Sequence, residues 1–240
     1  MDISIVIPAF EEAKKIAHDM QVAAQFLQDY NFAGEIIVVD DGSSDTTTNI
    51  ARQAGDQLGA NVTSYILRSE QNCGKGNAVK RGVNISTGDY VMFADCGCCV
   101  PYENVLDGLE LIKNNHCEIA HGSRVHAKTK ITNPQTLYRR LCSVMFRFIV
   151  SRLTKIPGHL TDTQCGFKVY KGSVARELYA DCITEGFMFD IEIILRAQKA
   201  GYRIKEFPIT WTCDRDTRLH PAKTIGPVLK ELKKIKKSLN

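Results

Sequence analysis

The sequence of 240 residues has no apolar run long enough to cross a bilayer. The longest run, residues 142–150, is interrupted by Arg147. The N-terminal stretch lacks the basic leader and cleavage site of a signal peptide, so we expect the protein to be made and kept in the cytosol. With 44% hydrophobic and 24% charged residues, the composition is that of an ordinary globular chain, and one large domain is expected.

The chain also lacks a strong excess of charge of one sign and a regular cysteine framework. A formal net charge of +4 is too small to indicate a nucleic-acid partner, and we expect none. Nine cysteines, an odd number without a regular spacing, are typical of a reducing compartment with mostly buried thiols. Cys96, Cys98 and Cys99 are clustered, but their spacing fits none of the usual zinc patterns.

The basic residues are unevenly distributed along the chain. Residues 138–156 and 229–239 alternate apolar side chains with Arg or Lys at roughly helical spacing. This pattern is typical of an interfacial helix, which buries an apolar face in lipid and places cations among anionic head groups. The alternative is a pair of surface helices that pack inward with one face and are solvated on the other.

Short apolar, β-branched runs alternate with helical patterns over the first part of the chain. The runs are residues 3–8, 35–40, 62–67 and 90–95, and the helical patterns are residues 12–28, 45–58 and 75–85. This alternation predicts an α/β fold with a mostly parallel sheet and right-handed crossovers. Ligands of such sheets bind outside the carboxyl ends of the strands, so we expect the site in the loops that follow the four runs.

Two of these loops carry charged residues in informative positions. Asp40 and Asp41 follow a strand as adjacent acids, which repel each other unless a ligand uses them, and either could accept hydrogen bonds from a base or a ribose. Asp45 is expected to cap the next helix. Lys75 lies between two glycines at the start of a helical pattern, where backbone N–H groups and the ammonium would face one anion. The spacing of a P-loop is absent.

Seven segments, taken together in their order, resemble the family-two glycosyltransferases, in particular the dolichyl-phosphate glucose and mannose synthases. They are IVIPAFEE, VVDDGSSD, LRSEQNCGKGNAVKRGV, GDYVMFAD, GSRV, DTQCGFKVY and EGFMFDIEIILRAQKAGYRIKEFPITW. The resemblance covers about residues 1–212, and DTQCGFK with GFMFDIEIILRA is closest to the glucose branch. It implies the GT-A fold, a nucleotide-sugar donor, inversion at the anomeric carbon and a polyprenyl-phosphate acceptor.

The resemblance also implies roles for individual residues. The implied donor-binding residues are Pro8, Ala9, Glu12, Asp40, Asp41, Lys75 and Gln164. Of these, the first three would line the nucleoside pocket, the two aspartates would hold base or ribose, and Lys75 would lie near the diphosphate. The implied acceptor-binding residues are Arg124, Arg139 and Arg140, which would hold the lipid phosphate. Arg124 could instead be a structural hydrogen bonder, and the two adjacent arginines could lie on a solvated helix face.

Asp95 falls on the first acid of the family's DxD metal motif, but the motif is incomplete. Family members usually read Asp-Ala-Asp, whereas this chain reads Asp95-Cys96-Gly97. Mg²⁺ commonly uses one or two protein carboxylates and completes its shell with phosphates and water. We therefore expect Asp95 to hold Mg²⁺ or Mn²⁺ weakly, mainly with the donor bound. The competing interpretation is an inactive nucleotide-sugar-binding protein.

The predicted catalytic residues are Asp95, Arg124, Asp162 and Asp190. A metal at Asp95, aided by Lys75, would stabilise charge on the leaving diphosphate. A phosphate acceptor needs no general base, because its second pKa is about 6. A soluble or protein hydroxyl acceptor would need one, and Asp190 is the candidate. Asp162 and Gln164 could instead fix their loop, and Asp190 could simply favour a helix dipole.

The sequence therefore predicts one GT-A domain over residues 1–215 and a basic tail over residues 216–240. The predicted activity is transfer of a hexose, glucose from UDP-glucose with GDP-mannose as the second donor candidate, to a polyprenyl phosphate at the cytosolic face of a membrane. Peripheral attachment would rest on residues 138–156, on the basic tail or on a partner subunit.

Overall fold

The computed structural model describes residues 1–59, 62–154, 156–214 and 225–239. Within these ranges, the side chains of residues 138–142, 148, 149, 151, 225–227 and 229 lie outside the description.

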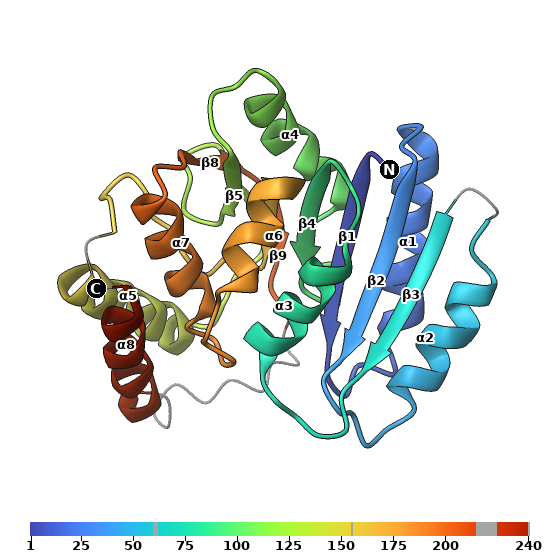
Figure 1. Ribbon diagram of the computed structural model, residues 1–240, viewed down its shortest axis with the longest axis horizontal. Coiled ribbons are helices and arrows are strands. Elements are labelled where there is room, and N and C mark those ends of the chain that lie inside the picture. Colours follow the sequence, from blue (N-terminus) through green and yellow to red (C-terminus); the bar gives the residue numbers. More distant parts are fainter. Residues whose placement is uncertain (60–61, 155, 215–224, 240) are drawn as a thin grey trace.

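A seven-stranded sheet runs through the molecule in the order β3-β2-β1-β4-β7-β5-β8 (Figure 1). Its strands are β1 (Ile3–Ala9), β2 (Gly34–Asp40), β3 (Val62–Arg68), β4 (Tyr90–Ala94), β5 (Ile119–Ser123), β7 (Phe167–Lys171) and β8 (Ile204–Pro208). All neighbouring pairs are parallel except those of β7, which runs antiparallel to β4 and β5. The predicted α/β class with a mostly parallel sheet is confirmed.

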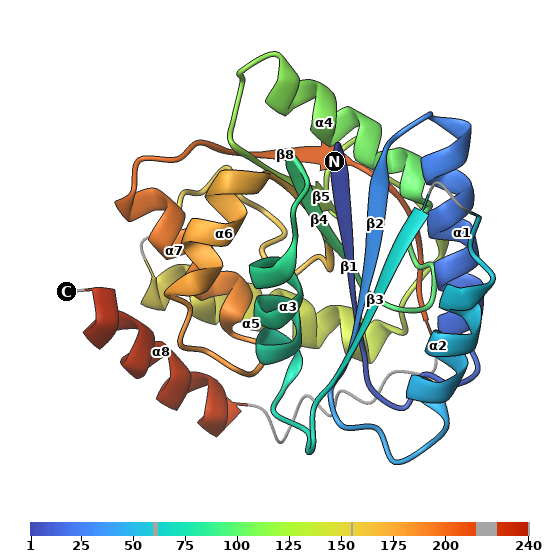
Figure 2. The ribbon, with the colours of Figure 1, turned by 45° about the vertical axis from the view of Figure 1, so that its right-hand side comes forward.

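Helices cover both faces of this sheet, because alternate residues of its central strands point to opposite sides. Ile5 and Ile7 of β1 pack in one core with α1 (Ile16–Asp29) and α4 (Val105–Lys113). Val6 packs in another core with α3 (Lys75–Ile85), α6 (Gly172–Ala180) and α7 (Phe189–Lys199). The remaining helix of these two layers is α2 (Thr47–Asp56). Figures 1 and 2 show α3 and α6 on the face opposite α1.

The predicted strands agree with the observed ones to within one residue at most ends, and α3 has the predicted bounds. Helix α1 begins at Ile16 instead of residue 12, because tertiary hydrogen bonds hold the preceding loop in another conformation. The backbone N–H of Glu11 donates to Ser43 Oγ at 2.8 Å, and that of Glu12 donates to Thr47 Oγ1 at 2.8 Å. Glu11 itself has a φ of 56°.

A smaller apolar core lies beside the sheet, where α5 (Leu137–Leu153), α7 and α8 (Ile225–Leu239) meet. Val150, Met188, Ile191, Leu232 and Ile235 are buried in it. Two further strands, β6 (Lys130–Asn133) and β9 (Thr210–Thr212), form a separate two-stranded parallel sheet. A short 3₁₀ helix, η1 (Tyr102–Asn104), precedes α4. The predicted boundary at residue 215 falls in residues 215–224, outside the described residues. Among the described helices, none has the length and apolar character to span a membrane.

Candidate active site

A cavity of about 660 Å³ opens at the carboxyl ends of β1 and β4 and is walled on the other side by α5 and the start of α7. The lining residues predicted from the sequence are Pro8, Ala9, Glu12, Asp41, Lys75, Asp95, Arg124, Asp162, Gln164 and Asp190. Asp40 lies behind the wall, fully buried. The side chains of Arg139 and Arg140, on α5, lie outside the described residues. The fold thus gathers nearly all of the described candidate residues around one space.

Lys75 and Asp95 form an ion pair at the edge of the sheet. Lys75 is the first residue of α3, Asp95 directly follows β4, and Lys75 Nζ lies 2.5 Å from Asp95 Oδ1. The ammonium also lies over the ring of Phe93, 5.7 Å from its centroid. Burial alone would lower the pKa of Lys75, but the charges of Asp95 and Asp190, together with the hydrogen bond to Asp95, outweigh burial and raise the pKa. Lys75 is therefore a fixed cation in the cavity.

Gly166 keeps the Asp95 carboxylate in this position. The backbone N–H of Asp95 donates to the Gly166 carbonyl at 2.9 Å, and a Cβ on Gly166 would overlap the Asp95 carboxylate. The glycine of the DTQCGFK segment is thus required by the close approach of β4 and β7.

The acids Asp40 and Asp41 have donors within the protein, so their adjacency does not require a ligand. Asp41 accepts the backbone N–H groups of Cys73 at 2.9 Å and Gly74 at 2.7 Å, and so holds the glycine loop before α3. Asp40 accepts the N–H and Oγ of Ser43 at 2.9 and 2.6 Å, and Thr48 also bonds it. Asp41 reaches the cavity and Asp40 does not, because its carboxylate is turned into its own loop. Contact of either acid with base or ribose stays a prediction.

Arg124 and Asp162 form a bidentate pair on the wall beyond β5. The Arg124 Nε and Nη2 atoms donate to the two Asp162 oxygens at 2.7 Å each, and the Arg124 backbone N–H donates at 2.8 Å. Burial disfavours the charge of Asp162, but the charge and hydrogen bonds of Arg124 prevail, so the pKa of Asp162 is lowered. The guanidinium also lies over the ring of Trp211, with its carbon 5.7 Å from the centroid. Asp162 is therefore placed to orient Arg124.

Asp190, in the first turn of α7, is paired with Lys168 of β7. Both side chains are almost fully buried, and Lys168 Nζ also donates to the Thr163 carbonyl at 2.9 Å. Burial raises the pKa of Asp190, and the charges of Lys168 and Lys75 offset this effect only in part. Because Asp190 already accepts a hydrogen bond from Lys168, it is less available as a general base for a hydroxyl acceptor.

Two residues that sequence reasoning missed belong to this site. Asp19 of α1 is buried and accepts the backbone N–H groups of Gly97 at 2.5 Å and Cys98 at 2.8 Å. It also accepts both neighbouring thiols, Cys96 Sγ at 2.8 Å and Cys98 Sγ at 2.7 Å. Burial, followed by the charge of Asp19, raises the pKa of both thiols. Asp19 therefore braces the loop after Asp95, and nothing in its helical sequence context indicates this role.

Arg147 of α5 is the second missed residue. Together with Ser143 and Phe146 it lines the cavity, and its charge helps to lower the pKa of Asp162. The spacing of the arginines could have indicated Arg147, because it follows the predicted acceptor-binding residue Arg140 by seven residues, which is about two helical turns. The structure therefore brings an α5 arginine to the wall that carries Arg124.

The remaining predicted contacts lie on the rim. Glu12 Oε2 is 3.5 Å from Lys15 Nζ, close to the carboxyl end of β1 with Pro8 and Ala9. Gln164 Nε2 donates to the Phe187 carbonyl at 3.1 Å and so ties the loop before β7 to the segment before α7. This hydrogen bond is the kind of structural role that the sequence left open for Gln164. The residue also lines the cavity.

This sheet, with its cavity at the carboxyl ends, has the architecture of GT-A glycosyltransferases. Glucosyl-3-phosphoglycerate synthase of Mycobacterium tuberculosis, solved with Mg²⁺ and UDP, superposes with a TM-score of 0.67 at 20% identity, covering 99% of this chain and 79% of that one. Mannosyl-3-phosphoglycerate synthase of Rubrobacter xylanophilus superposes with a TM-score of 0.68 at 15% identity, covering 98% and 73%. The predicted GT-A fold is confirmed.

Sequence comparison defines the family within this class. The family described as glycosyl transferase family 2 matches residues 4–179. Dolichyl-phosphate beta-glucosyltransferase of Dictyostelium discoideum is 30% identical over 253 residues, covering 98% of this chain and 73% of that protein. The human protein of the same name is 30% identical over 229 residues, covering 91% and 70%. The chain belongs to glycosyltransferase family 2 and is a glycosyltransferase, as its motifs predict.

Substitution of Gly166 by alanine should inactivate the site without unfolding the protein. The added Cβ displaces the Asp95 carboxylate from Lys75, and misplacing a catalytic group by about 1 Å lowers turnover by roughly a hundredfold. Glycosyl transfer and thermal unfolding are measured on the same preparation. Gly158→Ala is the matched control, because a Cβ there meets no atom within 4 Å, and it should leave both values unchanged. Wild-type turnover in Gly166→Ala would refute the assigned position of Asp95.

Proposed function

We propose that this glycosyltransferase moves glucose from UDP-glucose to the phosphate of a polyprenyl (dolichyl) phosphate, with inversion at the anomeric carbon. The observation that carries the proposal is that one cavity holds two groups of cations. Lys75 lies at the sheet edge, where the donor diphosphate of such sheets binds, and Arg124 with Arg147 lies toward the helical wall. The names of the dolichyl-phosphate beta-glucosyltransferases in Dictyostelium discoideum and human support glucose and a dolichyl-phosphate acceptor.

The carboxylates of the cavity favour a phosphate over a hydroxyl as the attacking group. Each of the three predicted catalytic acids is paired with a cation. The pairs are Asp95 with Lys75, Asp162 with Arg124 and Asp190 with Lys168. A phosphate monoester is already largely dianionic near neutral pH, because its second pKa is about 6, and it attacks without a general base. A hydroxyl acceptor would need one of these carboxylates released from its partner.

In this proposal the residues of the cavity have distinct tasks. Asp95 would hold Mg²⁺ or Mn²⁺, which would neutralise charge on the leaving diphosphate. The DxD position provides a single protein acid, and the donor phosphates would provide further oxygen ligands. Lys75 contacts the same diphosphate, and Arg124, oriented by Asp162, contacts the acceptor phosphate together with Arg147 and the Ser143 hydroxyl.

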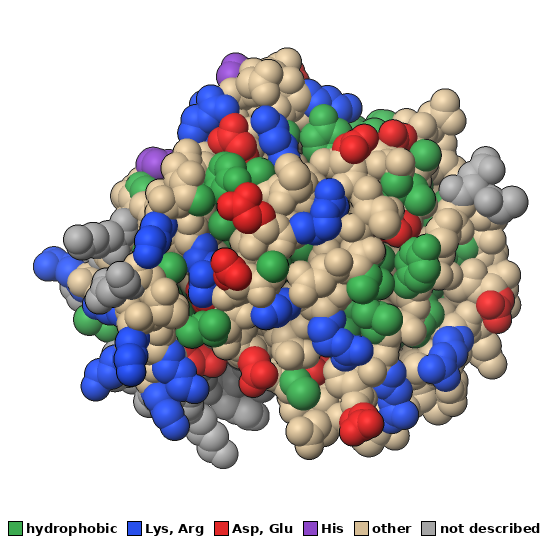
Figure 3. All heavy atoms as spheres, viewed as in Figure 1, with side chains coloured by type: hydrophobic (Ala, Val, Ile, Leu, Met, Phe, Trp, Pro, Cys, Tyr) green, Lys and Arg blue, Asp and Glu red, His purple; other side chains and the backbone are tan. Residues whose placement is uncertain are grey.

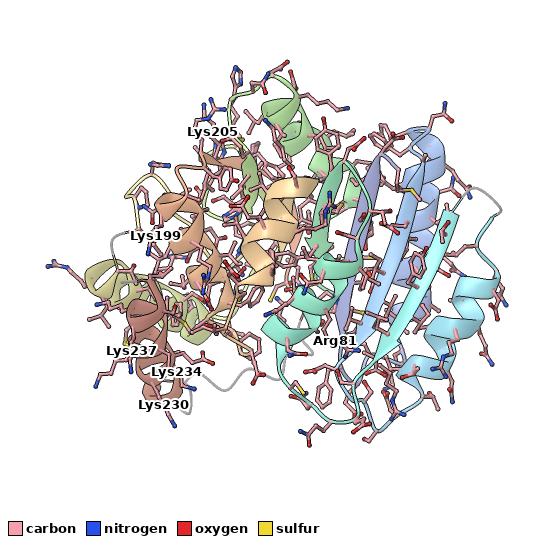
Figure 4. The ribbon with its side chains drawn as sticks, viewed as in Figure 1. Arg81, Lys199, Lys205, Lys230, Lys234 and Lys237 are labelled. Atoms are coloured by element: carbon pink, nitrogen blue, oxygen red, sulfur yellow. The ribbon has the colours of Figure 1, made fainter. Side chains whose placement is uncertain are left out.

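The surface around α5 and α8 fits peripheral contact with an anionic membrane. Leu137 of α5 is 84% exposed, and Val144 and Met145 are each 47% exposed. Helix α8 buries Leu232 and Ile235 against the protein and turns its lysines outward. Figure 3 shows Lys and Arg side chains gathered over this helix, and Figure 4 labels Lys230, Lys234 and Lys237 there. Apolar side chains and cations on one side would hold the cavity near lipid acceptors.

The function is tested by incubating the protein with radiolabelled UDP-glucose, Mg²⁺ or Mn²⁺, and a short-chain polyprenyl phosphate. We expect a glucosylated lipid phosphate, more slowly or not at all from GDP-mannose, and no product with Asp95→Asn. Product formed only with a soluble or protein hydroxyl acceptor would contradict the proposal in favour of the second acceptor class. Tight nucleotide-sugar binding without any product would instead indicate a degenerate, non-catalytic protein.

Removing the Arg147 charge should weaken use of the acceptor and spare the donor. Loss of a charge-assisted hydrogen bond of about 1.5–3 kcal/mol corresponds to a fall of roughly tenfold to a hundredfold in kcat/KM for the lipid phosphate in Arg147→Gln. The UDP-glucose dissociation constant should stay at the wild-type value. Arg152→Gln, an exposed arginine on the same helix, is the matched control. An equal loss of kcat/KM in both variants would contradict a specific contact of Arg147 with the acceptor phosphate, because any positive charge on α5 would then have the same effect.

The membrane contact is tested by cosedimentation with vesicles that contain phosphatidylserine. Each lysine near an anionic surface contributes about 1 kcal/mol, so Lys230→Gln/Lys234→Gln should lower the partition coefficient by roughly thirtyfold at low salt. Lys113→Gln/Lys205→Gln removes the same charge from α4 and β8, which lie at the top of Figure 1, away from α8 at the lower left. A similar loss in both double variants would show that only net charge matters.

A further inference from the structure

The loop after Asp95 has a backbone that excludes an acid at the position where family members carry one. Gly97 has a φ of 109°, a conformation that side-chain-bearing residues rarely adopt. Its N–H donates to the buried Asp19 at 2.5 Å, which fixes the loop in this conformation. An aspartate at position 97 would therefore be strained, and a second carboxylate must come from elsewhere if the site has one.

Asp214, two residues beyond β9, lies where a side chain on Gly97 would project. Its Oδ2 atom is 3.4 Å from the place that a Cβ on Gly97 would occupy. The backbone holds it there, since the Thr212 N–H donates to the Cys99 carbonyl at 2.8 Å and the Cys213 N–H donates to the Asn133 carbonyl at 3.0 Å. Asp214 and Asp95 line the same cavity.

We propose that Asp214 supplies the second carboxylate of the divalent-cation site, in place of the acid absent from position 97. The inference rests on the proposed function, which uses a nucleotide-sugar donor and a divalent cation. The donor set fits such a cation, because carboxylate oxygens are the ligands that Mg²⁺ and Mn²⁺ prefer. Among the described residues no three His, Cys, Asp or Glu side chains converge on one point, so the donor diphosphate supplies the remaining oxygens.

Each of these two carboxylates is paired with a lysine. Lys75 Nζ lies 2.5 Å from Asp95 Oδ1, and Lys15 Nζ lies 2.7 Å from Asp214 Oδ2. The two ammonium groups carry the same total charge as one divalent cation. With Asp95 and Asp214 holding a cation, Lys15 and Lys75 would be available to contact the phosphates of the donor, which carry the opposite charge. The cation therefore competes with Lys15 and Lys75 for the two carboxylates, and its affinity stays low until the nucleotide is present.

The test measures Mn²⁺ binding by electron paramagnetic resonance of the free ion, with and without UDP and with no acceptor. Asp214→Asn should lower Mn²⁺ affinity in the presence of UDP by roughly tenfold or more, as expected for loss of one carboxylate ligand, and Asp214→Glu should restore part of it. Asp107→Asn, an exposed acid in the first turn of α4, is the matched control and should bind as wild type does.

A second variant separates metal binding from a structural ion pair. Lys15→Gln removes the competing ammonium, so it should raise Mn²⁺ affinity in the absence of UDP by a few-fold and lower UDP affinity. If Asp214 only anchors Lys15, both variants lose stability in thermal unfolding while their Mn²⁺ affinities match wild type, and the inference is overturned. If Asp214→Asn does not fold, Asp214→Glu and Lys15→Gln carry the same comparison.

The wild-type protein distinguishes this inference from the function on which it rests. Mn²⁺ binding that strengthens with UDP in the wild type, but equally in Asp214→Asn, refutes the role of Asp214 alone. Absence of Mn²⁺ and UDP binding by the folded wild type would refute the donor and metal assignments, and the role of Asp214 with them.

Discussion

The pairing of each cavity carboxylate with a cation or with backbone N–H groups is the constraint on which the site depends. Parallel strands end at one edge of the sheet, so the acids that follow them are brought together around one cavity. A buried charge without a partner costs several kcal/mol, so the acids are stable there only with cations or N–H groups bound to them. The cations are Lys15, Lys75, Arg124 and Lys168. The proposed substrates are anions, so the cations that pair with these acids are also suited to bind the substrates.

Backbone geometry holds these charges in place. Gly166 leaves room for the Asp95 carboxylate, and Asp41 holds the loop that positions Lys75. On the opposite wall, Glu231 of α8 accepts backbone hydrogen bonds from Gly186 and Met188, next to the cavity. Helix α8 therefore packs on the segment that forms the cavity wall, and its lysine face lies on the outer side of the same helix. The helix that we propose to contact the membrane thus also supports the wall of the cavity.

Sequence patterns indicated the loops that line the cavity but did not show which partner each residue has within the protein. Asp40 was expected to face a ligand with Asp41, yet it bonds within its own loop, and a one-dimensional pattern cannot show which way a carboxylate turns. Asp19 was missed because its partners lie 77 to 79 residues away in the sequence. Arg147 was within reach of helical periodicity, since it continues the face of Arg140 two turns later.

The sequence by itself determined the alternation of strands and helices, the edge of the sheet at which the site lies, and the family, because apolar periodicity and local motifs depend on neighbouring residues only. Only the tertiary structure decided which charges pair with one another. Asp214 and Gly97 are separated by more than a hundred residues, and no local spacing relates them. They meet because β9 is hydrogen-bonded to the loop after β4, so long-range backbone pairing, and not composition, places Asp214 beside Gly97.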